Sequence, residues 1–316
     1  MALVFPVATA GPTLAAPLYA ITGLGTLGGD FTAAYGINNS GEVTGLSTVA
    51  NGDSHAFITG PNGIGMTDLG GFKGLAINQI GQVIFGDNGG TIYVTGPNGV
   101  SASPLGGTSP NSLGFQGSFG FGFGTVNASG QIAGTKDSQG NILMDGPSIH
   151  GGTNNGPVGS HAFVTGPNGF GLTDLGTLGG SNSFARGIND EGQVVGGSNL
   201  AGTVWQGLDG LDAPLTVRRA TLWSDGSIFD LTTLLDPNDP FVLSTASFTL
   251  DTAVGINDEG QIVADGFGYF DNGAFFNQAF LLTPESVPEP TSLALFGTAL
   301  AALVAVRRRK RKRKVA

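Results

Sequence analysis

Short β-prone runs rich in Val, Ile, Leu and Phe alternate with glycine-rich turns along most of the chain. The clearest example is Asp174 to Gly197, where two such runs flank Asn189-Asp190-Glu191-Gly192. The asparagine side chain can bond to the backbone two residues on, and the glycine supplies the positive φ that a type I turn with a bulge requires. This segment therefore predicts a β-hairpin.

The same marker turn, Asn-x-x-Gly followed by Gln or Glu and a β-branched residue, occurs five times at intervals of 40 to 68 residues. Its Asn and Gly residues are Asn38 and Gly41, Asn78 and Gly81, Asn127 and Gly130, Asn189 and Gly192, and Asn257 and Gly260. A period of this size that varies by insertion is typical of a propeller or an array.

Two further runs follow each predicted hairpin. The third run is clearest as His55-Ala56-Phe57 and His161-Ala162-Phe163, and weaker copies lie at 91–95, 219–223 and 278–282. In three copies it leads into an identical Gly-Pro-Asn-Gly turn, where proline fixes φ and Asn and Gly tolerate the tight bend. A fourth run, such as Leu172–Leu175, ends at a glycine-rich corner. Each repeat thus predicts four antiparallel strands, which is the content of one propeller blade.

The order of the runs suggests how such a ring would close. A lone fourth-type run at Tyr19–Ile21 comes first, and the last repeat stops after its third run at Gln278–Leu282. We therefore predict an all-β, five-bladed β-propeller over residues 19–284, closed by pairing the first strand with the last repeat. A β-solenoid or a pair of sandwiches is the alternative, but the first and last repeats of a solenoid never meet.

Insertions and termini differ in composition from the repeats. Three insertions, at Asp137–Gly159, Leu200–Val217 and Asp236–Ser247, are expected to project from one face. Residues 1–18 are apolar and small, and we interpret them as the remnant of a signal peptide, with a disordered arm as the alternative. Residues 285–316 form a third predicted domain.

This last domain has three parts. Val287-Pro288-Glu289-Pro290 predicts a rigid spacer, Ser292–Val306 is an uncharged apolar run, and Arg307–Lys314 is a continuous basic block. The apolar run predicts a membrane helix, and the basic block would stay in the cytoplasm and leave the repeats outside. Its place after an apolar run favours this stop-transfer interpretation over a nuclear localisation signal.

The charge of the chain argues against several classes of partner, and its lack of cysteine excludes two kinds of bond or site. The chain has 13 basic and 23 acidic residues, and the basic block holds eight of the 13. The remainder is acidic and poor in lysine, which argues against nucleic acid and anionic lipid surfaces as partners. The chain has no cysteine, so disulfides and thiolate zinc sites are excluded.

Three patterns suggest chemistry, and each has a structural interpretation that we prefer. Gly23–Gly28 matches G-x-G-x-x-G, but no helix pattern follows, so we interpret it as a corner between strands. His55 and His161 could meet at a metal, but we expect each to bond a neighbouring turn. Acidic turn residues such as Asp190 and Asp258 could bind Ca²⁺ weakly, but we expect them to be solvated. The sequence thus predicts no catalytic residue, cofactor site or metal site.

The repeats resemble the HAF family of probable extracellular repeats. The residues that carry this resemblance are Asp174–Gly180, Gly187–Asn189, Gly192–Gly196 and His161–Phe163. It covers most of the chain, although repeat copies two, four and five replace the histidine and the third copy lacks the Ile before Asn127. The resemblance implies an exported protein of undefined activity, with no catalytic residues to transfer.

The C-terminus resembles the PEP-CTERM sorting signal, through Pro288-Glu289-Pro290, the apolar run and the basic block. This resemblance implies recognition by an exosortase, transient membrane anchoring, and a Gram-negative host that makes exopolysaccharide. We therefore expect a non-enzymatic cell-surface or matrix protein that associates with exopolysaccharide. The competing classes are a glycan hydrolase, whose two carboxylates need only meet in space, and a carbohydrate-binding propeller that stacks sugars on Trp205 or Trp223.

Overall fold

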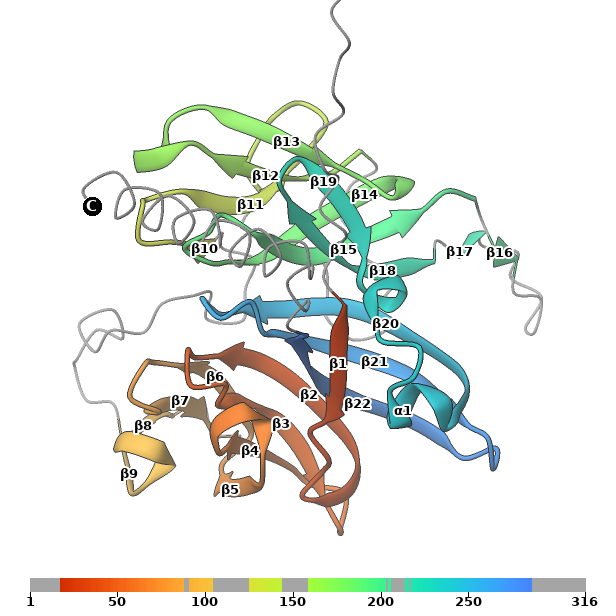
Figure 1. Cartoon of the computed structure of the whole chain (residues 1–316). Coiled ribbons are helices and arrows are strands. Elements are labelled where there is room, and N and C mark those ends of the chain that lie inside the picture. The colour runs from red at the N-terminus through yellow and green to blue at the C-terminus, as the bar shows by residue number, and fades with distance from the viewer. Residues whose placement is uncertain are drawn as a thin grey trace, which may run out of the picture. The chain divides into compact units, whose positions relative to one another are not determined.

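The computed structural model describes residues 18–87, 91–104, 125–143, 159–202, 204–205, 214–215 and 217–285. Residues Tyr19–Pro284 belong to one compact unit. Its described elements are β-strands apart from single 3₁₀ turns and one short helix, α1 (Pro240–Leu243) (Figure 1). The prediction of an all-β repeat region is therefore confirmed for the described residues. Residues 1–17 and the expected membrane helix at Ser292–Val306 lie outside the described residues.

The main strands form five antiparallel repeats of four strands each, which we number in chain order. Repeat 1 contains β2 (Gly28–Ile37), β3 (Val43–Val49), β4 (Ser54–Thr59) and β5 (Met66–Gly70). Repeat 2 contains β6 (Lys73–Ile77), β7 (Val83–Gly86), β8 (Ile92–Thr95) and β9 (Ala102–Pro104). Repeat 3 contains β10 (Thr125–Val126), β11 (Ile132–Lys136), β12 (His161–Thr165) and β13 (Leu172–Gly176).

Repeat 4 contains β14 (Gly179–Ile188), β15 (Val194–Leu200), β18 (Arg218–Ser224) and β19 (Ser227–Asp230). Repeat 5 contains β20 (Thr245–Ile256), β21 (Ile262–Phe270), β22 (Phe275–Pro284) and, as its fourth strand, β1 (Tyr19–Gly23). The insertion within repeat 4 holds a small hairpin of β16 (Val204–Trp205) and β17 (Pro214–Leu215).

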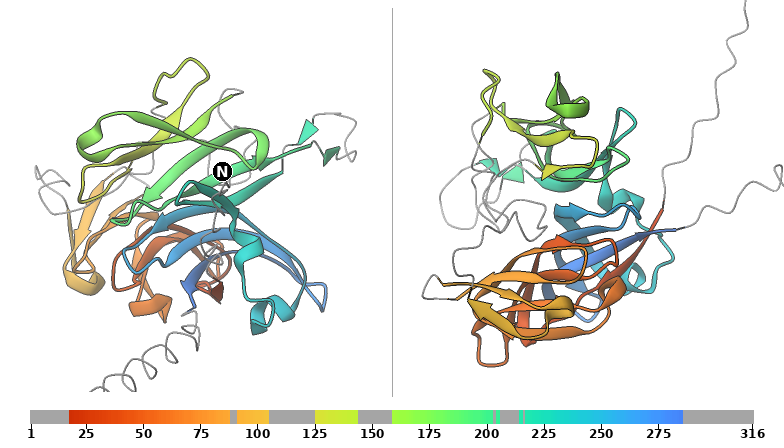
Figure 2. Two further views of the ribbon diagram at one scale, coloured as in Figure 1. Left: turned by 45° about the horizontal axis from the view of Figure 1, so that its top comes forward. Right: turned by 90° about the vertical axis from the view of Figure 1, so that its left-hand side faces the viewer.

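The first strand of the chain pairs with the last, as the order of the runs predicts. β1 lies antiparallel to β22, with Tyr19 opposite Pro284 and Gly23 opposite Phe280 (Figures 1 and 2). Repeat 1 joins the same sheet, because Phe31 of β2 pairs in parallel with Asn277 of β22. The two ends of the repeat array therefore meet at β22.

The insertion at Asp236–Ser247 packs on repeat 5 instead of forming a free loop. Asp239 caps α1 by accepting the Phe241 N–H at 2.8 Å, and it also accepts the Ile21 N–H of β1 at 3.1 Å. The Phe241 ring contacts four aromatic rings of β20, β21 and β22, at centroid distances of 5.0 to 6.0 Å: Phe248, Phe270, Phe276 and Phe280. This insertion covers one face of repeat 5 and the outer edge of β1.

The core is divided among neighbouring repeats. Phe57 and Phe163, the phenylalanines of the two His-Ala-Phe segments, are buried at 0% and 1% exposure. Phe57 packs in a cluster with Val263 and Leu281 of repeat 5, and Trp223 of repeat 4 packs with residues of repeat 3. Burial of each such side chain contributes about 1.5–3 kcal/mol, so adjacent sheets stabilise one another.

Candidate functional site

The five marker turns have one common geometry. In each, the glycine N–H donates to the asparagine carbonyl at 3.0–3.1 Å, and the asparagine Oδ1 accepts the backbone N–H four residues on at 2.8–3.0 Å. The five glycines have φ between 70° and 79°, the left-handed region that glycine adopts without strain. The marker sequence therefore forms the expected hairpin turn in every repeat.

The marker asparagines also link the repeats to one another. Each Nδ2 donates to the Glu or Gln side chain of its own turn at 2.6–2.9 Å. In four of them Nδ2 also donates to the carbonyl of the next marker asparagine at 3.0–3.2 Å, in the order Asn127 to Asn189, Asn257, Asn38 and Asn78. We call this chain of bonds the asparagine relay. It requires a side-chain NH₂ group, which explains why Asp or Ser does not occupy the position.

A second set of bonds runs beside the relay. In four repeats the residue after the marker asparagine donates its backbone N–H to the side chain of its counterpart in the next repeat. These bonds are Ala128 to Asp190 at 2.7 Å, Asp190 to Asp258 at 3.0 Å, Asp258 to Asn39 at 3.2 Å and Asn39 to Gln79 at 2.9 Å. Asp190 is exposed and Asp258 is half-buried, and both carboxylates also accept bonds between repeats, which the sequence did not predict.

The first strands of all five repeats line one cavity of about 340 Å³. In four repeats the strand pairing shifts by one residue three positions before the marker asparagine, and this β-bulge falls on Tyr35, Leu75, Arg186 and Val254. All four residues line the cavity. Bulges re-aim a side chain, so the bulge residue determines the chemistry of the cavity wall.

The first strands of neighbouring repeats approach each other closely at the residue after the bulge, so that residue has little room for a side chain. A Cβ on Gly187 would lie 3.2 Å from the Gly255 Cα, and one on Gly255 would lie 3.3 Å from the Ile37 Cγ2. Contacts this close would require backbone or side-chain shifts. The Gly-Ile-Asn sequence before the marker turn therefore reflects packing between neighbouring repeats.

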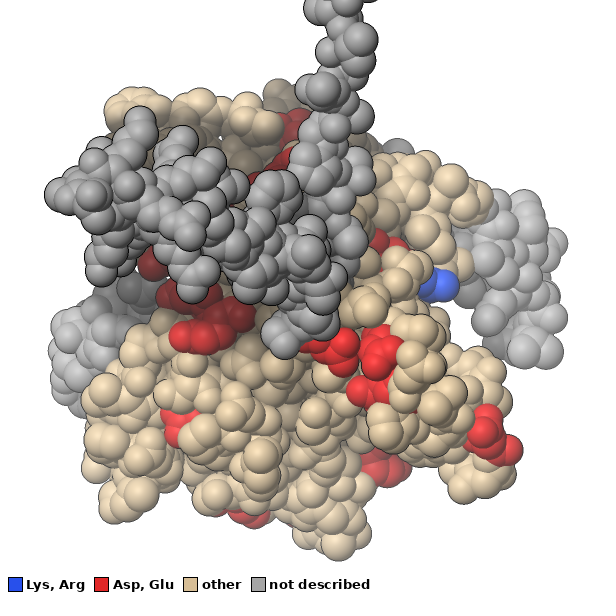
Figure 3. Space-filling view, in the orientation of Figure 1, with Lys and Arg blue, Asp and Glu red and all other residues tan. Residues whose placement is uncertain are grey.

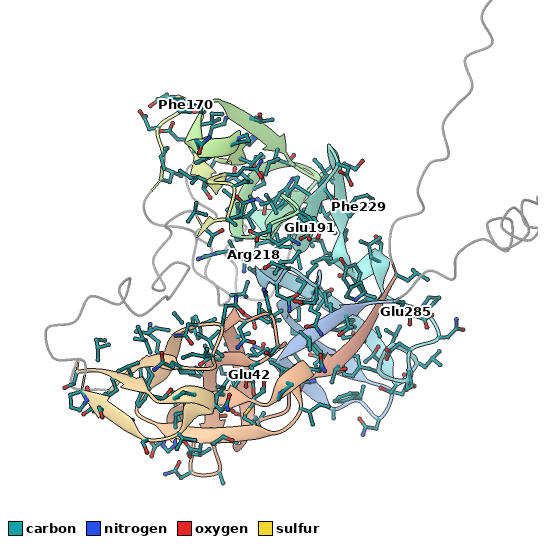
Figure 4. The ribbon with its side chains drawn as sticks, turned by 60° about the vertical axis from the view of Figure 1, so that its left-hand side comes forward. Glu42, Phe170, Glu191, Arg218, Phe229 and Glu285 are labelled. Atoms are coloured by element: carbon teal, nitrogen blue, oxygen red, sulfur yellow. The ribbon has the colours of Figure 1, made fainter. Side chains whose placement is uncertain are left out.

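A buried charged cluster joins repeats 4, 5 and 1 beside this cavity. Asp265 of β21 is 6% exposed, and its Oδ1 accepts the Ala34 N–H at 3.1 Å. Arg218, which Figure 4 labels, forms an ion pair with Asp251. The Arg186 and Arg218 guanidinium groups lie 5.4 and 5.5 Å from the centre of the Phe184 ring.

Burial shifts the proton affinities in this cluster. It raises the pKa of Asp265 to about 8, although the Ala34 N–H and the two guanidinium groups lower it. It also lowers the pKa of Arg186 to about 10, with Arg218 adding to the effect, and raises the pKa of Tyr35 to about 12. Sequence reasoning missed this cluster. The sequence feature that could have revealed it is the scarcity of basic residues. Only five lie outside the basic block, and two of them, Arg186 and Arg218, belong to this cluster.

The two histidines bond within their own repeats. His55 Nδ1 lies 2.8 Å from Asp68, and His161 Nδ1 lies 3.0 Å from Asp174. Each aspartate is on the fourth strand of the same repeat, so the partner is a strand residue instead of the expected neighbouring turn. In the described part of the chain, no group of three or more His, Cys, Asp or Glu residues is placed to hold a metal ion.

Two other sequence hypotheses concern the glycine-rich corner and the tryptophans. Gly23–Gly28 connects β1 to β2 without a helix, and the Thr26 hydroxyl donates to the Gly29 carbonyl at 2.8 Å, as Thr177 does to Gly180. The segment is therefore a repeated corner. Trp223 is 3% exposed and is unavailable for stacking on a sugar, whereas the side chain of Trp205 lies outside the described part of the chain.

Comparison with known proteins identifies the tail. The PEP-CTERM protein-sorting motif matches residues 286–310, which include Val287-Pro288-Glu289-Pro290, the apolar run and the start of the basic block. No curated protein sequence matches the chain. Among the described residues, no helix has the length and apolar character to cross a membrane. The sorting motif indicates a protein that is exported, recognised by an exosortase and sorted to the surface.

Proposed function

We propose that residues 19–284 form a five-bladed β-propeller and that the protein is a non-enzymatic component of the cell surface or extracellular matrix of a Gram-negative bacterium. In this proposal it associates with exopolysaccharide, after transient anchoring of its tail in the membrane. The observation that carries the export and sorting is the motif match at residues 286–310. The HAF resemblance of the repeats agrees with an extracellular location.

Three structural observations support the propeller. The first strands of all five repeats face one cavity, the asparagine relay passes through all five marker turns, and β1 supplies the fourth strand of repeat 5. In a solenoid, the terminal repeats would not contact each other. Here repeats 5 and 1 pair directly through Asn277 and Phe31.

The use of polar groups around the cavity supports a structural role over an enzymatic one. A glycan hydrolase needs two carboxyl groups that can reach the scissile bond. Asp190 and Asp258, the acidic residues that line the cavity, both accept backbone N–H groups from the neighbouring repeat. These hydrogen bonds favour a role for both carboxylates in holding adjacent repeats together.

The sorting proposal is tested by expressing the full chain in hosts with and without an exosortase and reading the mature C-terminus by mass spectrometry. We expect removal of Arg307–Lys314 only in the exosortase host, and loss of this processing when Pro288-Glu289-Pro290 is replaced by alanines. Glu285→Ala, just upstream, is the matched control and should be processed normally. An exported chain that keeps its basic block in both hosts would indicate a simple membrane anchor.

The non-enzymatic assignment is tested separately. The purified full chain is incubated with neutral and anionic polysaccharides, and released reducing ends are measured. We expect no release above buffer. Release that disappears in Asp190→Asn or Asp258→Asn would instead establish the hydrolase alternative.

A further inference from the structure

The outer half of repeat 5 has two faces with different surroundings. On one face, Phe248, Phe270, Phe276 and Phe280 pack around Phe241 of the insertion. On the other face, Phe267, Tyr269 and Phe275 are 45%, 50% and 58% exposed. Soluble proteins rarely leave grouped aromatic side chains in water without a binding role.

Strand register places these three aromatic residues together with small polar ones. Tyr269 lies directly opposite Phe275 on β22 and Ser247 on β20, and Phe267 lies opposite Asn277 and Thr249. Directly opposed residues share one face of the sheet, so the six side chains form two adjacent rows. The Tyr269 and Phe275 rings touch edge to face, with centroids 5.3 Å apart.

The polar members of these rows have unused hydrogen-bonding capacity. Within the described residues, the side chains of Ser247, Thr249 and Asn277 make no hydrogen bond to the protein. They offer two hydroxyl groups and one amide beside exposed ring faces. Sugars present the matching groups, with apolar C–H faces for the rings and hydroxyls for the polar side chains.

Charge selects among ligands. None of the six side chains is ionised at neutral pH, and the chain outside the basic block is strongly acidic. On the face drawn in Figure 3, acidic side chains are spread over the described surface and basic ones are rare. Anionic polymers would be repelled, whereas an uncharged polymer would not.

The size of the surface argues against a stable protein interface. Three aromatic side chains of about 150–250 Å² each, roughly half exposed, offer on the order of 300 Å². A stable interface buries about 800 Å² per partner, and an apolar partner would leave Ser247, Thr249 and Asn277 unsatisfied. Strands about 4.8 Å apart and rows about 7 Å apart give a footprint suited to a short stretch of polysaccharide.

We propose that this face is a binding platform for an uncharged polysaccharide, whose sugar rings stack on Phe267, Tyr269 and Phe275 and whose hydroxyls bond Ser247, Thr249 and Asn277. The platform defines the class of exopolysaccharide that the proposed function leaves open, and it rests on that function for its biological setting. Binding in solution does not depend on exosortase processing, so the two proposals fail in different experiments.

The test is native affinity electrophoresis of the full chain, in a zwitterionic detergent without a sugar head group. The gels contain dextran, hydroxyethyl cellulose or xyloglucan as neutral probes, and alginate as the anionic probe. We expect retardation by at least one neutral probe. We expect none by alginate once Arg307–Lys314 is replaced by glutamines, because the basic block itself would bind an anionic polymer. The triple variant Phe267→Ala, Tyr269→Ala and Phe275→Ala should weaken this binding at least tenfold.

A matched triple variant removes exposed apolar residues elsewhere: Ile64→Ala, Val100→Ala and Phe170→Ala. It should bind within twofold of the wild type, and circular dichroism should show that both variants remain folded. Failure of every neutral probe to bind, or equal loss in the two triple variants, would overturn the proposal. Sedimentation that shows a wild-type dimer abolished only by the platform variant would assign the face to contact between copies instead.

Discussion

Repeats 1–3 and repeats 4–5 build the same marker turn but support it differently. In the first three repeats the Gly-Pro-Asn-Gly turn packs on the marker turn of its own repeat, as when the Gly63 N–H donates to the Gly41 carbonyl at 2.9 Å. Repeats 4 and 5 contain no Gly-Pro-Asn-Gly turn, and their marker turns carry Asp-Glu. The asparagine relay is thus the constant element, whereas its local support varies.

Exposed residues follow the same division. The residue after each Gly-Pro-Asn-Gly turn is apolar and exposed: Ile64, Val100 and Phe170, at 72%, 64% and 80%. Phe170 projects from the end of repeat 3, whereas Glu191 occupies the marker turn of repeat 4 (Figure 4). Solvent-facing positions and the residue after each marker asparagine differ between the two groups, whereas the marker asparagines that bond to neighbouring repeats are the same in both.

The largest expected effect comes from breaking the element that both groups share. Asn38→Ala and Asn189→Ala each remove two donors and leave buried acceptors unsatisfied, so each should lower the free energy of unfolding by about 3 kcal/mol. Chemical denaturation measures this loss. Asn39→Ala, which removes contacts of a less buried side chain, should cost about 1 kcal/mol. Clearly unequal losses at Asn38 and Asn189 would show that the relay is not equivalent in the two groups.

The buried charged cluster, which joins repeats 4, 5 and 1, predicts that the stability of the fold depends on pH. Because the pKa of Asp265 is about 8 when folded and about 4 when unfolded, the native state holds a proton that the unfolded state lacks between these values. This stabilising contribution is complete below about pH 4 and is lost as the pH rises through 8. Asp265→Asn should therefore gain stability relative to the wild type as pH rises, by an amount on the order of a few kcal/mol.

Denaturation of both proteins across this pH range isolates the effect from other carboxylates. A constant difference between the wild type and Asp265→Asn would contradict the raised pKa. Asp53→Asn, at an exposed turn, is the matched control and should show no such trend.

A smaller difference in stability should distinguish marker turns that pack on a Gly-Pro-Asn-Gly turn from those that do not. Gly41 and Gly192 have φ of 72° and 79°, so alanine costs about 1–2 kcal/mol at either. A Cβ at Gly41 would also lie 2.9 Å from the backbone nitrogen of Asn62, whereas the nearest atom at Gly192 is 3.3 Å away, on the flexible Gln131 side chain. Gly41→Ala should therefore lose about 1–2 kcal/mol more than Gly192→Ala in thermal or chemical unfolding. Equal losses would mean that the Gly-Pro-Asn-Gly contact carries no stability.

The smallest effect is a gain. Ala128 has no side-chain acceptor, so the second set of bonds has no link from repeat 2 to repeat 3. Ala128→Asp would supply an acceptor for the Gln79 N–H and should raise the free energy of unfolding by about 0.5–1 kcal/mol. Ser129→Asp adds the same charge one residue later and should not stabilise. A destabilised Ala128→Asp variant would argue against a close approach of these turns.

Local features of the fold and the pairing of its two end strands followed from the sequence, whereas the side-chain contacts between repeats did not. The geometry of Asn189 to Gly192 is set within five residues, and counting strand types gave the pairing of β1 with β22. The relay was missed because the partner of Asn189 is Asn257, and turn chemistry alone does not specify it. Asp265 bonds Ala34 across most of the chain, which no local pattern reveals.

The aromatic residues of repeat 5 show the same limit. Phe267 and Tyr269 alternate with glycine on β21, a pattern that does not tell which face is covered. The face that carries Phe248 and Phe276 is covered because Phe241 packs on it. Phe241 belongs to the insertion at Asp236–Ser247, which the sequence had predicted to project from the repeats. Sequence periodicity gives the two faces of a strand, but only tertiary contacts identify the buried one.

Closure of the five repeats can be measured directly, because the chain contains no cysteine to interfere. Gln79→Cys with Ala128→Cys places thiols on the equivalent turn positions of repeats 2 and 3, and Ser40→Cys with Ser129→Cys places them on repeats 1 and 3. If the repeats close into a propeller, mild oxidation should give an intramolecular disulfide in the first pair and none in the second, as read by non-reducing mass spectrometry. Absence of an intramolecular disulfide in Gln79→Cys with Ala128→Cys, in a protein that remains folded, would contradict the closed ring.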